Sequence, residues 1–392
     1  MKSKYQTFFS ILIGILIGCS VSFGQTLIQG TVAISSTGIV DYSGRNSYDA
    51  ELPRLVGWTF KGMNWQLEPQ SWETEEVIEN IRQYGVNTIR RHFASAPLME
   101  DGASTRATYF SRWHNVANWC ARNGMWVIFD FYTRDLGDNQ GTYGMKWVWE
   151  MPETDFLELW RVIAREMKDH GNVLLELGNE PNDYGMDYPE HRDIWMQRCI
   201  KAIEVIRQEG FQGYIVLPLP EVATWAPPAL AYRSQVIDAD PLTRFMWDFH
   251  YYWYHQEYQV GTPDDYSLSD VQGWLDQKSI SDLRTLGDRV LCGEFGVHGQ
   301  DYDPRDLQWF RNLLTILKRD GYDMICEGFQ PGQDFPQLQG DWATTDWTTL
   351  NRQGHVYVTS VPSDLTYYLN PALSHTQYLP TIQRLLERAG VS

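Results

Sequence analysis

From about residue 55 onward, short apolar runs alternate with segments in which apolar residues recur every three or four positions. The runs are typical of buried strands, and the longer spacing is typical of amphipathic helices. Alternation of the two predicts a parallel sheet with helical crossovers. We expect eight strands, at residues 59–64, 87–91, 126–131, 173–182, 214–217, 245–251, 289–294 and 324–326.

Eight such strands favour an α/β fold of the (β/α)₈ TIM-barrel type over residues 49–392. A doubly wound open sheet is the competing fold, but the glycine-rich phosphate loop typical of that fold does not follow the first strand. Upstream, residues 25–48 contain two short apolar runs, 31–34 and 39–41, around a Ser-Ser-Thr-Gly turn. These runs predict a short N-terminal β-hairpin cap.

The first 24 residues resemble an export signal rather than part of the fold. Lys2 and Lys4 precede an apolar segment, residues 8–17, which is too short to span a bilayer. Processing has two candidate sites: a lipobox that would leave a lipidated Cys19 at the N-terminus, or ordinary cleavage after Gly24. We therefore expect an exported protein, either lipid-anchored in a bacterial cell envelope or secreted or periplasmic.

The composition limits which binding partners can be expected. A net charge of −18 repels phosphate backbones, so nucleic acid is excluded as an expected partner. The chain is 14% aromatic with 17 Trp, which suits a groove that stacks on sugar rings as well as a large core. Apart from Cys19, four cysteines lie in apolar patterns whose spacing fits no zinc motif, and we expect buried free thiols, although export also permits a disulfide. These are Cys120, Cys199, Cys292 and Cys326.

Several predicted strands end in polar residues that a barrel would bring to one rim. Glu180 ends the fourth strand and Glu294 the seventh. A pair of carboxylates can hydrolyse a glycosidic bond, because one donates a proton to the leaving oxygen while the other attacks the anomeric carbon. Arg90 and Tyr252 would keep Glu294 ionised and leave the proton to Glu180. The alternative is that Arg90 pairs with a structural acid.

At these residues the chain resembles glycoside hydrolase family 5, the cellulase family of retaining barrel glycosidases, over about residues 37–340. Residues 173–182 are similar to the acid/base segment of that family, and residues 293–296 to its nucleophile segment. The resemblance implies that Glu180 is the acid/base and Glu294 the nucleophile. It further implies substrate-binding roles for Arg90, Asn179, His250 and Tyr252.

Two departures from the family pattern concern the substrate. Tyr132 stands where many members have a His after the third strand, and we expect it to replace that His. The eighth strand lacks the usual Trp, so Phe329, Trp342 or Trp347 could stack on the sugar instead, while Glu327 adds a third acid whose role stays open. Further aromatic residues near strand ends are candidate sugar platforms, above all Trp65 and Trp225, with Trp147, Trp149 and Trp253.

The sequence thus predicts a monomeric retaining glycosidase on a β-linked polysaccharide or oligosaccharide, with glucan or mannan implied by the resemblance. We expect neither a cofactor nor a metal. One alternative is a surface polysaccharide-binding lipoprotein that keeps the barrel without the chemistry. Another is a transglycosylase that uses the same two glutamates.

Overall fold

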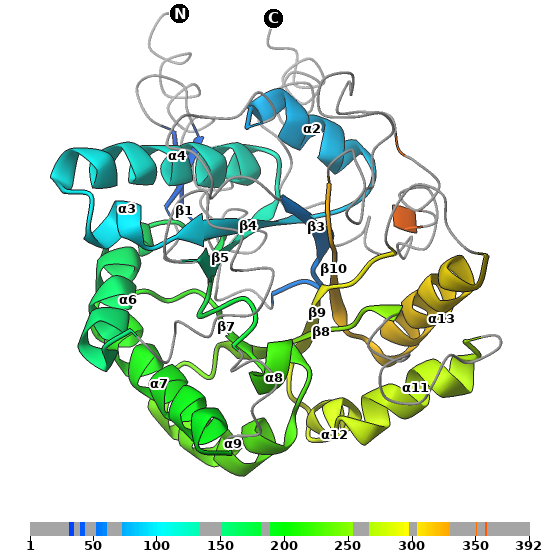
Figure 1. The fold of residues 1–392 in the computed structure, drawn as a ribbon. Helices are drawn as coiled ribbons and strands as arrows, with labels where there is room; N and C mark the ends of the chain where they lie inside the picture. Colours follow the sequence, from blue (N-terminus) through cyan, green and yellow to red (C-terminus); the bar gives the residue numbers. More distant parts are fainter. Residues whose placement is uncertain are drawn as a thin grey trace, which may run out of the picture.

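Eight parallel strands close into a barrel in the computed structural model, which describes residues 31–34, 40–43, 52–60, 73–133, 151–181, 189–253, 266–297, 304–329, 350 and 357–358 (Figure 1). The predicted TIM barrel is confirmed. In barrel order the strands are β10 (Asp323–Cys326), β3 (Val56–Phe60), β4 (Thr88–Ala94), β5 (Trp126–Thr133), β6 (Val173–Glu176), β7 (Ile215–Pro218), β8 (Phe245–His250) and β9 (Val290–Glu294).

Helices surround the barrel (Figure 1). Those of the described segments are α2 (Glu75–Gln83), α3 (Ala96–Met99), α4 (Ala103–Arg122), α6 (Glu153–Met167), α7 (Pro189–Gln208), α8 (Pro220–Ala223), α9 (Pro227–Ala239), α11 (Leu268–Gln277), α12 (Ile280–Thr285) and α13 (Pro304–Asp320). Their ends follow the local sequence. For example, Thr74 accepts a hydrogen bond from the backbone of Val77 at the start of α2, and α4 stops at Asn123 before Gly124, whose φ is positive.

The first barrel strand lies earlier in the chain than the sequence predicts. We expected residues 59–64, but β3 runs from Val56 to Phe60. The reason is tertiary, since Gly57 to Phe60 pair with Thr88 to Arg91 of β4, and Val56 to Trp58 pair with β10. Apolar residues lie both before and after Val56, so the sequence pattern alone does not show where the strand begins to pair.

Two apolar layers pack against the strands, one outside the barrel and one within it. Side chains of alternate strand residues point to opposite faces. The outer layer joins strands to helices and includes Phe93, Phe129 and Trp113. The inner layer fills one end of the barrel and consists of Leu52, Leu55, Ile128, Leu174, Val216, Met246, Leu291 and Ile325. Asp130, Glu176 and Asp248 each follow a residue of this layer by two positions, so these buried acids lie beyond it, toward the carboxyl ends of the strands.

Tyr357 bonds the backbone where the last barrel strand meets the first. Its buried hydroxyl accepts from the Gly57 amide (3.1 Å), and its single proton lies between two acceptors, the carbonyl oxygens of Gly57 (2.8 Å) and Met324 (3.1 Å). A side chain at position 57 would be excluded, because a Cβ there would lie 1.8 Å from the carbonyl oxygen of Thr88. The seam thus depends on a glycine and on a tyrosine 300 positions away.

Near the N-terminus, β1 (Thr31–Ile34) and β2 (Val40–Ser43) pair as an antiparallel two-stranded sheet. That these strands cap the barrel, and the domain limits at residues 24 and 48, stay predictions. The predicted export signal lies outside the described residues. Among the helices described, none combines the length and the apolar character needed to cross a membrane.

Candidate active site

Arg90 lies at the centre of a charged layer inside the barrel. Its guanidinium group is fully buried and donates two 2.7 Å hydrogen bonds to Glu176 of β6 and one of 2.7 Å to Glu294 at the end of β9. Asp130 of β5 lies 3.3 Å away. Burial lowers the pKa of Arg90, but these three carboxylates raise it well above its ordinary value. The predicted neighbour of Arg90, Glu294, is therefore present, and Glu176 is a second, structural partner.

Glu294 receives hydrogen bonds on both carboxylate oxygens. Arg90 donates to Oε1, and the Tyr252 hydroxyl donates to Oε2 at 2.7 Å. The side chain is 7% exposed. Two donors on a buried carboxylate stabilise its ionised form.

Glu180 lies beside Glu294 in a different environment. Its Oε1 is 2.7 Å from Nδ1 of His250 on β8, and no guanidinium contacts it among the described residues. Burial raises the pKa of Glu180, and the charge of Glu294 adds to that rise, although His250 and Arg90 oppose it. One oxygen of Glu180, one of Glu294 and one His250 nitrogen all lie within 4.8 Å of one another. The structure thus brings together a carboxylate that favours its proton and one held ionised.

Asn179 is fixed by the same arginine. Its Oδ1 accepts a 2.8 Å hydrogen bond from Arg90, which assigns the oxygen and leaves Nδ2 as the donor end of the amide. The backbone of Asn179 donates to Phe131 at the end of β5.

His92 is a candidate residue that the sequence reasoning did not single out. Its Nδ1 lies 2.5 Å from Asp130, and its Nε2, which has no hydrogen-bond partner among the described residues, is 4.0 Å from Glu294 Oε1. Tyr132, the predicted substitute for the family His, packs against the His92 ring, with centroids 4.1 Å apart and planes tilted by 34°. Besides His250 of β8, a second histidine near Glu294 therefore comes from β4, and none comes from the described part of β5. Its position two residues after Arg90 was a usable signal, because such residues share a strand face.

Three buried acids beneath the rim were also missed: Asp130, Glu176 and Asp248. Each lies inside the barrel, two or four positions before a rim residue of its own strand. Burial raises the pKa of Glu176 well above its ordinary value, with Asp130 and Asp248 adding to the rise and Arg90 opposing it. Asp248 lies 3.1 Å from Nε2 of His250. Counting back from the rim residues by two finds Asp130 and Asp248, and counting back by four finds Glu176.

The predicted aromatic platforms have different placements. Phe329 is 1% exposed and packs against Trp58 and Phe60 at 5.0 and 5.5 Å between centroids, so it is a core residue and not the sugar-stacking ring that we expected. Trp225 is half-buried after β7, with Lys278 Nζ 5.1 Å from its ring. Trp65, Trp147, Trp149, Trp342 and Trp347 lie outside the described residues.

Glu327 is fully buried at the rim after β10, and its amide donates to Phe295 at 2.9 Å. One ligand atom each of His92, Glu294 and Glu327 lie within 4.8 Å of one another, and Glu176, Asp248 and His250 form a similar group. Arg90 already bonds Glu294 and Glu176 at 2.7 Å, and His250 lies 3.1 Å from Asp248. We therefore assign the groups to hydrogen bonding within the site.

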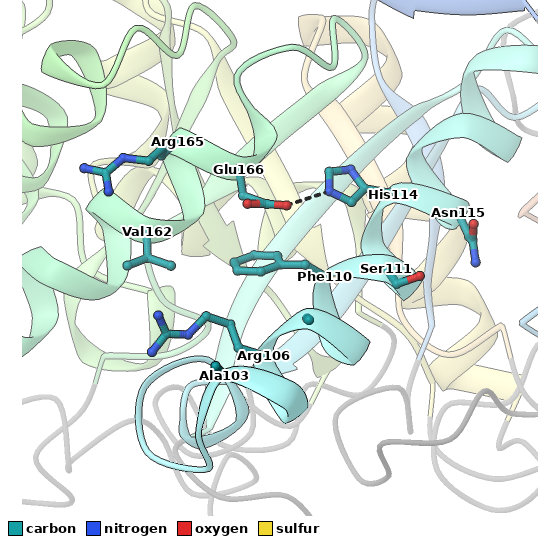
Figure 2. A pocket seen from close by; sticks show the side chains of 10 residues that line it. Ala103, Arg106, Phe110, Ser111, His114, Asn115, Val162, Arg165 and Glu166 are labelled. Carbon is teal, nitrogen blue, oxygen red and sulfur yellow. Dashed lines mark hydrogen bonds and ion pairs between the residues drawn. The ribbon is translucent and has the colours of Figure 1, made fainter.

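A separate surface groove of about 520 Å³ lies between α4 and α6 (Figure 2). His114 and Glu166 are joined there at 2.9 Å, beside Phe110, Arg106 and Arg165. With one carboxylate already bonded to a histidine, the groove lacks the paired acids found in the barrel.

Comparison with known proteins places this geometry in context. Residues 46–326 match the family model described as cellulase (glycosyl hydrolase family 5). Endoglucanase B of Clostridium cellulovorans is 25% identical over 210 residues, which cover 49% of this chain and 46% of that protein. The chain thus spans about half the length of this curated relative.

Solved structures share the fold. The catalytic domain of the major endoglucanase from Xanthomonas campestris pv. campestris has a TM-score of 0.61 at 17% identity, covering 85% of this chain and 97% of that one. An endoglucanase of Pseudomonas stutzeri in complex with cellobiose has a TM-score of 0.60 at 18% identity, covering 79% and 92%.

Proposed function

The chain belongs to glycosyl hydrolase family 5, and from this premise we propose that it is a retaining glycoside hydrolase that cleaves a β-linked polysaccharide or oligosaccharide by double displacement. The separation of Glu180 and Glu294 carries the proposal. Retaining enzymes place their two carboxyl groups about 5–5.5 Å apart, whereas inverting enzymes leave about 6.5–9.5 Å for a water molecule. Oxygens within 4.8 Å favour the retaining reaction.

In the first step, Glu294 attacks the anomeric carbon while the bond to the leaving oxygen breaks. Glu180 gives its proton to that oxygen, and a covalent glycosyl–Glu294 ester results. The hydrogen bonds from Arg90 and Tyr252 suit Glu294 to this role, because they keep the attacking carboxylate ionised.

In the second step, a water molecule replaces the departed group. Glu180, now ionised, takes a proton from the water while the water oxygen bonds to the anomeric carbon and the ester to Glu294 breaks. Asn179 is suited to donate from Nδ2 to a sugar hydroxyl, since Arg90 already occupies its oxygen.

We infer a β-glucan as the first substrate to test. Endoglucanase B is a curated relative, and an endoglucanase of Pseudomonas stutzeri with a similar fold was solved in complex with cellobiose. Mannan is the second candidate, since tryptophan side chains such as those of Trp65 and Trp225 can stack on the rings of either sugar.

Substitution of the two glutamates tests the proposal. Glu180→Gln and Glu294→Gln should each lower kcat by ~10³-fold or more on soluble β-glucans, because each change removes a chemical participant. The matched control is Glu209→Gln, which changes an exposed pair with Arg165 on the helical surface and should leave kcat unaltered. Near-normal hydrolysis by either active-site variant would contradict the assignment, and product sizes would separate hydrolysis from transglycosylation.

Added azide provides a further test. In Glu180→Ala the anion can enter the space left by the carboxylate and attack the glycosyl–Glu294 ester. The expected product is a β-glycosyl azide, since two inversions retain the configuration. An α-glycosyl azide would instead identify Glu180 as the nucleophile and Glu294 as the acid/base.

We also propose that the protein is exported, either with a lipid on Cys19 or after cleavage at Gly24. The basic and apolar segments at residues 2–17 support export under either processing. Growth with radioactive palmitate distinguishes the two, because only the lipobox route attaches acyl chains. Absence of label from the wild-type chain, with Cys19→Ser as the unlabelled reference, would remove the anchored form.

A further inference from the structure

Asp248 lies two residues before His250 on β8, on the same inward face of the strand. We propose that Asp248 is a positioning residue, which holds a proton on Nε2 of His250 so that Nδ1 faces Glu180 as the acceptor of its acid proton. The inference rests on the proposed function of Glu180 as acid/base. In this inference, Asp248 determines where the proton lies between Glu180 and His250, although Asp248 itself contacts neither the sugar nor the leaving group.

Two successive contacts connect Asp248, His250 and Glu180. Asp248 Oδ2 lies 3.1 Å from Nε2 of His250, and Nδ1 of the same ring lies 2.7 Å from Glu180 Oε1. Asp248 and His250 are fully buried, so no bulk water competes for these contacts. The partner of one imidazole nitrogen determines which nitrogen carries the proton in the neutral ring.

Gly293 makes room for the Asp248 carboxylate. A Cβ at that position would lie 2.3 Å from Asp248 Oδ1 and 2.7 Å from Oδ2, closer than any side chain tolerates. The register between β8 and β9 shifts between Phe249 and His250, which sets His250 opposite Glu294 and not opposite Gly293. The regular alternation of β8 thus puts the Asp248 carboxylate on the same face as the imidazole, and Gly293 leaves the space that the carboxylate occupies.

Among the described residues, ionisable groups from β4, β6, β8 and β9 lie around this pair, while β7, which pairs with β8, carries none. Glu176 belongs to β6 and Glu180 follows it, Cys292 and Glu294 lie on β9, Arg90 lies on β4, and Tyr252 follows β8. Arg90 is committed to Glu176, Glu294 and Asn179. Among the described residues, His250 is the basic side chain that contacts both Asp248 and Glu180.

The surrounding charges favour a proton on the His250–Glu180 pair. Burial lowers the pKa of His250, but Glu294, Asp248 and Glu180 together raise it well above its ordinary value. With Asp248 bonded to Nε2–H, a single proton remains between Nδ1 and Glu180. It can leave with the glycosidic oxygen and return from water, while Nε2–H stays in place throughout.

Asp248→Asn tests the inference through proton transfer. The neutral amide can donate to Nε2, which would move the ring proton to Nδ1 and favour ionised Glu180. We expect the alkaline limb of the kcat/KM profile to move to lower pH by about one unit or more. The loss of kcat/KM should be about tenfold larger for aryl glycosides with poorly acidic phenols than for the dinitrophenyl glycoside, whose departure needs little acid catalysis.

A matched control is Asp288→Asn. Asp288 is also a buried acid, but it pairs with Arg233 and the Trp247 indole outside the barrel interior. This variant should lose thermal stability while the alkaline limb and the leaving-group dependence stay as in the wild type.

The outcomes separate the inference from the function. A wild-type protein without activity on any β-glycoside would overturn the proposed function. An active wild type with an unshifted limb and unchanged leaving-group dependence in Asp248→Asn would overturn the role of Asp248 alone. If that variant does not fold, ¹⁵N NMR of the wild-type imidazole decides the matter, with His250→Gln for assignment: a proton on Nε2 supports the inference, and a bare Nε2 contradicts it.

Discussion

Arg90 and Arg91 are neighbours in the chain, yet their guanidinium groups lie on opposite sides of the barrel wall. Arg90 faces inward and binds Glu176 and Glu294. Arg91 faces the helices, where it contacts Glu73 at 3.1 Å and lies over the rings of Trp113 and Phe129. Burial lowers the pKa of Arg91, whereas the carboxylates of the site outweigh burial at Arg90. One position along a strand thus separates a site residue from a packing residue.

The inward parity of β4 leads to a prediction for His92. His92→Ala should lower kcat/KM by about 10- to 100-fold. Asp130 holds the proton on Nδ1, so the buried Nε2, 4.0 Å from the nucleophile, can accept a hydrogen bond from a sugar hydroxyl, and leaving that hydroxyl unpaired costs about 1–3 kcal/mol. Monodeoxy substrates provide the check. On the analogue that lacks the contacted hydroxyl, wild type and variant should have similar kcat/KM. An equal loss on every analogue would indicate a structural role.

At the scale of elements, α4 and α6 meet through two histidines. His114 Nδ1 lies 2.7 Å from Nε2 of His170, which follows α6. Burial, with a smaller effect from His114, lowers the pKa of His170 from 6.5 to about 4. The folded protein therefore binds fewer protons at His170 than the unfolded chain does between these two pH values.

Folding stability should consequently fall as the medium becomes acidic. The contribution of neutral His170 is fully present above pH 6.5 and is lost as pH falls toward 4, by about 3 kcal/mol at most. Urea unfolding of the wild type and of His170→Gln at pH 7 and 4.5 measures it. Each protein should lose free energy of unfolding between pH 7 and pH 4.5. Because the other titrating groups are the same in both proteins, the wild type's loss minus the variant's loss gives the contribution of His170. Equal decreases would contradict the assigned pKa shift.

For the molecule as a whole, the interior has an apolar half and a charged half. The inner apolar layer packs one end of the barrel, and the carboxylates gather around Arg90 toward the other end. A buried carboxylate is costly unless it is hydrogen-bonded or protonated. Groups that bind protons are therefore concentrated at the carboxyl ends of the strands.

The free thiols expected from the sequence are present and buried, namely Cys120, Cys199, Cys292 and Cys326. The disulfide alternative is therefore excluded for these four residues.

The sequence by itself determined the barrel and the residues at its strand ends. Alternating periodicity reports burial directly, and a polar residue that ends an apolar run is visible without knowledge of its neighbours. Glu180, Glu294, Arg90 and His250 were identified in this way.

Only the tertiary structure decided the start of β3, the core position of Phe329 and the partners of the buried acids. Each depends on strand register, and a shift of one residue moves every side chain to the other face. The bulge between Phe249 and His250 is such a shift. It sets His250 opposite Glu294. The contact between His250 and Glu180 joins segments 70 positions apart, whose pairing no local pattern encodes.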